Sequence, residues 1–156
     1  MDIIDIKDLP DDGPVVLIDA DSLLYFEMGK PTLEEAIAGI DHRILTMLNV
    51  NETCNFAGFL TIGRCFRYNA AKTKNYKYNR KHGSKPIIFY ALKEYLQQHW
   101  NFIYMSELEA DDLVAVYGDG YDGNTVICSP DKDVIYQVPG VHFNYRTAEH
   151  IHTTPD

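Results

Sequence analysis

The chain has 156 residues, of which 46% are hydrophobic and 24% charged, so it has neither the composition of a disordered protein nor the length of two full domains. No apolar run approaches the roughly 20 residues that cross a bilayer. Cys54, Cys65 and Cys128 lie far apart, and the N-terminus has no signal-peptide pattern. We therefore expect one cytoplasmic domain, residues 1–156, without a membrane partner.

Charge is distributed unevenly along the chain. The net charge is −9, yet eight of the fourteen basic residues fall in the segment 64–85, which contains no acid. The segment thus carries +8, and the remainder, with six bases and 23 acids, carries −17. Such a segment can be a solvated loop or an anion-binding surface, and for the charge run alone both interpretations stay open.

Helix and strand patterns alternate along the chain. Residues 15–18 form a short apolar run that predicts a buried first strand. Thr32 is a predicted helix N-cap. The helix that it starts is expected to bury Leu33, Ile37, Ile40, Ile44, Leu45 and Leu48. We expect further strands at 56–62, 102–105 and 125–128, helices at 86–99 and 108–117, and last elements at 134–138 and 141–145 before a polar tail. This order predicts an α/β fold, a three-layer α/β/α sandwich with a mainly parallel central sheet.

Acidic residues cluster where three predicted strands end. They are Asp19 and Asp21, then Glu109, Asp111 and Asp112, then Asp131 and Asp133. Singly, each can be a turn residue or part of a first helical turn. Together they are expected to converge outside the carboxyl ends of a parallel sheet. Oxygen ligands without His or Cys favour Mg²⁺ or Mn²⁺ over zinc, and a cation beside a basic segment suits phosphodiester hydrolysis.

Four segments resemble, in order, motifs of the flap endonuclease and 5′-to-3′ exonuclease superfamily, which has a PIN-like fold. They are 17–25, 66–67 with 76–80, 107–112, and 128–133. The likeness is greatest to the stand-alone 5′-3′ exonucleases of tailed phages, and it implies Mg²⁺- or Mn²⁺-dependent hydrolysis of DNA at 5′ ends, flaps or single strands, in phage replication or recombination.

The resemblance assigns roles to individual residues. It implies that the cation is held by Asp19, Glu109, Asp111 and Asp131, with Asp112 and Asp133 in support. It makes 64–85 an arch-like segment in which Lys77 and Arg80 contact the scissile phosphate as catalytic residues. Other residues of this segment are expected to bind DNA, namely Arg67, Lys72, Lys74, Tyr76, Lys81 and Lys85.

Two departures from the family pattern stand out. Thr61 occupies the position after the second strand where the family usually carries an Asp. The chain also ends before the family's Gly-Asp-x-x-Asp pair and its C-terminal duplex-binding region. We therefore expect weak activity from the chain alone, or a separate polypeptide that supplies the missing part.

Two other functions stay open at this point. The chain can be a catalytically inactive DNA-binding or regulatory relative, or a PIN-type ribonuclease. The His150-Ile151-His152 sequence is expected in the exposed tail rather than at a metal, and Trp100 in the core.

Overall fold

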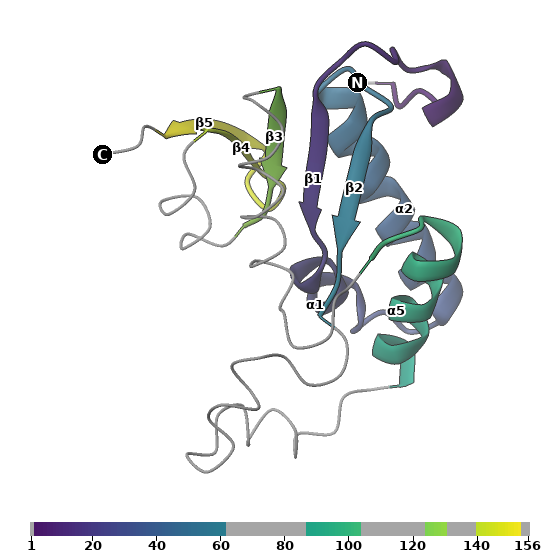
Figure 1. Cartoon of the computed structure of the whole chain (residues 1–156). Coiled ribbons are helices and arrows are strands. Elements are labelled where there is room, and N and C mark those ends of the chain that lie inside the picture. Colours follow the sequence, from purple (N-terminus) through teal and green to yellow (C-terminus); the bar gives the residue numbers. More distant parts are fainter. Residues whose placement is uncertain (1, 62–86, 104–123, 131–139, 154–156) are drawn as a thin grey trace.

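The computed structural model describes residues 2–61, 87–103, 124–130 and 140–153. Its elements are, in chain order, η1 (Ile6–Asp8), β1 (Val15–Asp19), α1 (Asp21–Glu27), α2 (Leu33–Val50), β2 (Phe56–Phe59), α5 (Ile87–His99), β3 (Thr125–Cys128), β4 (Gly140–Asn144) and β5 (Glu149–Thr153). The described strands form one sheet in the order β2-β1-β3-β4-β5, and among them only the β4–β5 pair is antiparallel (Figure 1). The predicted mainly parallel sheet is confirmed.

β1 lies inside the sheet, between β2 and β3, and both of its faces are covered. Val16 and Ile18 belong to the core cluster, which includes residues of α1, α2 and α5. Leu17 alternates with them and so points to the opposite face, yet it is also fully buried. Such two-sided burial is typical of strands in layered α/β proteins. The helix predicted at 108–117 lies outside the described residues.

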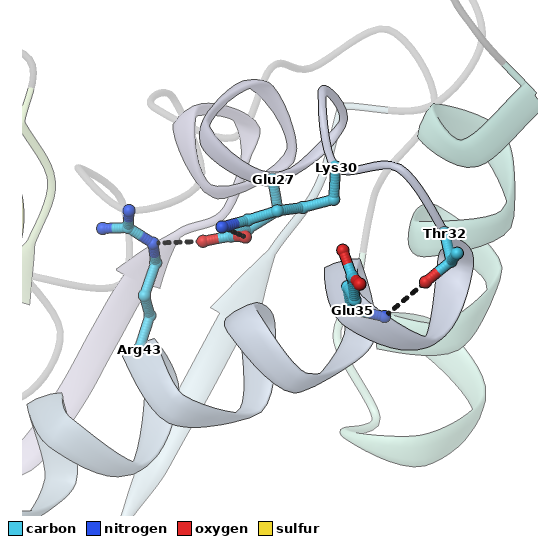
Figure 2. A network of polar contacts seen from close by, with 5 residues as sticks. All are labelled: Glu27, Lys30, Thr32, Glu35 and Arg43. Carbon is cyan, nitrogen blue, oxygen red and sulfur yellow. Dashed lines mark hydrogen bonds and ion pairs between the residues drawn. The ribbon is translucent and has the colours of Figure 1, made fainter.

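α2 begins as the sequence predicts. The Thr32 side chain accepts a hydrogen bond from the Glu35 N–H at 3.2 Å (Figure 2), which caps the helix. Ile40, Ile44 and Leu48 are buried as expected. Leu33 is 39% exposed, so its prediction as a core residue is wrong. Its position explains the error, because it is the first helical residue and lies almost a turn before the first buried one, Ala36.

Several predicted boundaries differ from the structure. The strand predicted at 56–62 ends at Phe59, and of the strand predicted at 102–105 the described part makes only an isolated bridge between Phe59 and Ile103. The prediction of a polar tail after residue 145 is wrong, because residues 149–153 form β5 and pair with β4. His150 packs on the Phe143 ring and lies 2.9 Å from the Asn51 side chain. Backbone pairing needs no apolar residues, which is why a polar segment forms this strand.

Asp41 connects α2 to α5. Its carboxylate accepts hydrogen bonds from the Tyr95 hydroxyl at 2.7 Å and from the Trp100 indole N–H at 2.8 Å. Burial of Tyr95, and secondarily its contact with Asp41, raises the pKa of Tyr95 to about 12. Trp100 is buried, as predicted. These contacts fix α5, the helix that follows the basic segment, against the core.

A partly buried ion pair connects α1 to α2. Glu27 Oε1 lies 2.7 Å from Arg43 Nε, and Lys30 Nζ lies 3.7 Å from Glu27 Oε2 (Figure 2). The Glu27 side chain is almost fully buried, whereas that of Arg43 is one-third exposed. Gly39 of α2 leaves the room for this carboxylate, because a Cβ there would collide with it.

We predict that Arg43→Met destabilises the protein by about 3 kcal/mol or more, because it leaves the buried Glu27 charge without its main partner. Glu27→Gln should lower the free energy of unfolding less, because the neutral amide that replaces the buried carboxylate needs no ionic partner. Urea unfolding at pH 7 measures both. Equal losses for the two variants would contradict this interpretation of the ion pair.

Candidate functional site

The parallel strands bring residues from four parts of the chain to one edge of the sheet. Asp19 ends β1, Thr61 follows β2, Ser129 follows β3 and Tyr145 follows β4. The chain places β2 on one side of β1 and β3 on the other. Such a reversal of strand order creates the crevice in which open α/β sheets bind ligands, and Asp19 lies directly at it.

The Asp19 carboxylate is held by hydrogen bonds from other elements. It is only 4% exposed. Its Oδ1 accepts from the Asp21 N–H at 3.3 Å, and its Oδ2 accepts from the Ser129 hydroxyl at 3.1 Å. The Tyr145 hydroxyl donates to the backbone carbonyl of Asp19 at 2.7 Å. A buried carboxylate bonded in this way has a fixed orientation.

Tyr145 also stiffens this edge. Its burial, and secondarily the negative charge of Asp19, raises the pKa of Tyr145 well above its usual range. The hydroxyl therefore stays protonated and remains a donor to Asp19. The Tyr145 ring meets Phe26 of α1 edge-on at 5.9 Å between centroids. Tyr145 thus connects the end of β4 to both β1 and α1.

The second acid of the first motif, Asp21, points to β2. Its Oδ1 accepts from the Thr61 N–H at 3.0 Å and its Oδ2 from the Thr61 hydroxyl at 2.6 Å. The Thr61 carbonyl in turn accepts from Lys93 Nζ of α5 at 2.6 Å. Thr61 thus donates two hydrogen bonds to the Asp21 carboxylate, one from its N–H and one from its hydroxyl.

Most of the residues predicted for the site lie outside the described part of the chain. Of the expected metal ligands, only Asp19 is described; the others are Glu109, Asp111, Asp112, Asp131 and Asp133. The predicted phosphate and DNA contacts are likewise outside it, namely Arg67, Lys72, Lys74, Tyr76, Lys77, Arg80, Lys81 and Lys85. Within the described residues, no three His, Cys, Asp or Glu side chains are placed to hold a metal ion.

The described residues nevertheless fit a hard cation at this edge. Asp19 offers carboxylate oxygens, the donor type that Mg²⁺ and Mn²⁺ prefer. Ser129 hydrogen-bonds the same carboxylate, as outer groups commonly do for metal ligands. Ser129 lies in the 128–133 motif, but nothing in the sequence shows that it meets Asp19, 110 residues away.

A separate shallow pocket lies beside the outer edge of β2. Its volume is about 260 Å³, and it is lined by Phe56, Ala57, Gly58, Trp100, Asn101 and Ile103. The lining carries no ionisable group and does not include Asp19. The pocket is therefore distinct from the sheet edge at which Asp19 lies.

In the described residues, no helix is long and apolar enough to cross a membrane.

Solved nuclease structures share this fold. The T5 5′-exonuclease with bound divalent metal ions (zinc) is 18% identical with a TM-score of 0.61, covering 90% of this chain and 58% of its own. The T5 D15 protein co-crystallised with metal ions is 21% identical with a TM-score of 0.57, covering 88% and 56%. The catalytic core of Rad2 in complex with DNA substrate is 14% identical with a TM-score of 0.56, covering 96% and 48%.

These likenesses confirm the predicted α/β fold, which the chain shares with the T5 5′-exonuclease and the Rad2 core. The chain spans about half the length of the structures it matches. No protein-family model and no curated protein sequence matches it. At these identities the structural likeness establishes architecture alone.

We predict that Tyr145→Phe lowers the free energy of unfolding by about 1–3 kcal/mol, because it removes the hydroxyl that donates to the buried Asp19 carbonyl. Urea unfolding at pH 7 measures the loss. Tyr90→Phe is the matched control, since Tyr90 is 58% exposed. A Tyr145→Phe protein as stable as wild type would contradict the assigned bond.

The same variant makes the pH dependence testable. Because the folded-state pKa of Tyr145 is raised, its contribution is present below the unfolded-state value of about 10 and is lost as pH rises above it. Wild-type stability should therefore fall more steeply between pH 9 and roughly 11 than that of Tyr145→Phe.

Proposed function

We propose that this chain is the catalytic part of a divalent-metal-dependent nuclease of the 5′-exonuclease and flap endonuclease type. One observation carries the proposal: a buried, hydrogen-bonded carboxylate, Asp19, ends the strand at which the sheet order reverses. The matched T5 5′-exonuclease binds divalent metal ions, and the matched Rad2 core was solved with DNA substrate. A similar chemistry for this chain agrees with its acidic motifs.

The proposed metal site joins Asp19 to acids from two other motifs. Glu109, Asp111 and Asp131 complete the set of ligands, with Asp112 and Asp133 in support. Carboxylate donors favour Mg²⁺ or Mn²⁺. When bound, the cation supplies activation of the attacking water and neutralises charge at the phosphate. Ser129 and Tyr145 hold Asp19 in the orientation that this role requires.

The basic segment is proposed to bind the substrate. Lys77 and Arg80 orient the scissile phosphate for attack by water, while the other bases of 64–85 and Tyr76 hold the DNA strand. Phosphate contacts of this kind attract DNA without reading its sequence. The positive charge of this segment also offsets part of the net charge of −17 on the rest of the chain, which repels DNA.

The chain by itself is proposed to be a weak nuclease. Thr61 contributes a hydroxyl and an N–H to Asp21 at the position where the family pattern has a carboxylate. The matched structures give no support for a separate polypeptide that completes the site, and this expectation stays a prediction. A role in phage replication or recombination, in the host cytoplasm, also stays a prediction.

A catalytically inactive DNA-binding relative is the second candidate. The observation in its favour is again Thr61, because an acid missing near Asp19 weakens any metal site at this edge. The two candidates differ in one measurable property, which is metal-stimulated cleavage of bound DNA.

We predict slow cleavage of 5′-flap DNA by the purified chain in Mg²⁺ or Mn²⁺, abolished by EDTA. Asp19→Asn should lower the single-turnover rate by about a hundredfold or more, because it removes a charged ligand from the site. Asp12→Asn, an exposed acid before β1, is the control and should cleave as wild type does.

Other outcomes identify the rivals. Tight DNA binding without metal-stimulated cleavage would establish the inactive relative. Cleavage of single-stranded RNA but not of flap DNA would establish a PIN-type ribonuclease.

We further predict that the basic residues divide into two groups. Lys77→Ala and Arg80→Ala should reduce the single-turnover rate more than DNA affinity, whereas Lys72→Ala and Lys74→Ala should do the reverse. Anisotropy titrations over a range of salt measure the affinity, whose logarithmic slope should decrease by about 0.7 for each lost phosphate contact on single strands. A salt-independent affinity would contradict the assignment.

A further inference from the structure

We propose that Asp21 and Lys93 are positioning residues of the nuclease site. Acting through Thr61, they fix the carboxyl end of β2 and the helix α5 relative to the candidate metal ligand Asp19. We name the three residues Asp21, Thr61 and Lys93 the latch. The inference rests on the proposed function, since what the latch positions is the cleavage site.

The latch is a continuous series of hydrogen bonds. It starts at Asp19, whose Oδ1 accepts from the Asp21 N–H at 3.3 Å. Asp21 then accepts twice from Thr61, at 3.0 and 2.6 Å, and Thr61 accepts from Lys93 Nζ at 2.6 Å. Three elements with no sequence proximity, α1, the end of β2 and α5, thereby meet beside one carboxylate.

The Asp21 side chain is not simply a helix cap. The N-cap of α1 is Ala20, whose side chain makes no capping hydrogen bond. An acid in a first turn ordinarily serves its own helix or faces solvent. Here both carboxylate oxygens cross to Thr61 instead. Hydrogen bonds to a charged acceptor are roughly twice as strong as neutral ones, so this contact resists displacement.

Lys93 fixes the other side of Thr61. Its ammonium lies 4.9 Å from the centroid of the Phe89 ring while donating to the Thr61 carbonyl. Phe89 is buried, so the cation is held at a defined place on α5. A positive charge here also offsets part of the negative charge that Asp19 and Asp21 place at this edge.

Two residues of the latch flank the basic segment in the sequence. Thr61 precedes residue 64 by three positions, and Lys93 lies in the second turn of the helix that follows residue 85. The latch therefore fixes the described residues on either side of the basic segment, Thr61 and Lys93, relative to Asp19. Reacting groups must be placed closely, and a misplacement of about 1 Å can cost about a hundredfold in rate.

The test uses the full chain and separates rate from affinity. Asp21→Asn removes the charge of the acceptor, and Thr61→Val and Lys93→Met each remove one donor of the latch; Thr61→Ser and Lys93→Arg keep the donors. Thr61→Val is the mildest change, because the Thr61 N–H bond to Asp21 survives. Single-turnover cleavage of 5′-flap DNA in Mg²⁺ gives the rate, and anisotropy in Ca²⁺ gives the affinity. Asp12→Asn and Lys7→Met are matched controls, as both residues are exposed before β1.

The latch predicts at least a tenfold lower rate for Asp21→Asn and Lys93→Met, with DNA affinity within threefold of wild type. Thr61→Ser and Lys93→Arg should recover the rate to within threefold. Rates that stay at the wild-type value overturn the latch, as do losses of rate and affinity in parallel without recovery. If wild type itself cleaves no DNA, the proposed function fails, and the role of the latch in cleavage fails with it.

Discussion

β1 is buried on both faces, so it can place a polar side chain at the surface of the sheet only where it ends. It ends at Asp19, whose carboxylate is almost fully buried. Asp19 is therefore the constraint on which this edge of the sheet depends. Burying a charge is costly unless hydrogen bonds or a cation compensate it. Ser129, after β3, and the Asp21 N–H of α1 donate such bonds to the carboxylate, and Tyr145, after β4, donates to the Asp19 backbone carbonyl. The same hydrogen bonds thus fix the orientation of Asp19 and the positions of α1 and of the ends of β3 and β4.

The contacts of Asp19 also connect stability to chemistry. Ser129 and Tyr145 are 110 and 126 residues away along the chain, so these contacts form only when β1, β3 and β4 have come together. The acids predicted to join Asp19 would repel it in the absence of a cation. The edge then resembles other functional sites, in which a local cost in stability is retained because binding removes it.

Much of the fold follows from local patterns in the sequence. The apolar runs of β1 and β3 and the cap at Thr32 were sufficient to predict their elements. β5 was missed because a polar strand is defined by its backbone partner, and α1 because seven residues give too short a periodic signal. The same limit applies to the site. Asp19 was predicted from its motif, whereas its bonds to Ser129 and Tyr145 depend on contacts that only the folded chain contains.

The two acids of α1 explain how so short a helix acquires a fixed place. An isolated helix of seven residues is marginal in water, so tertiary contacts must hold it. Asp21, its first residue, is bonded to Thr61 beyond β2, and Glu27, its last, is paired with Arg43 of α2. Phe26 packs on Tyr145 between them. Movement of α1 would break a partly buried ion pair at one end and hydrogen bonds to a charged acceptor at the other. The backbone that carries Asp19 into α1 is therefore preorganised before any ligand arrives, which is what the proposed metal-dependent catalysis requires.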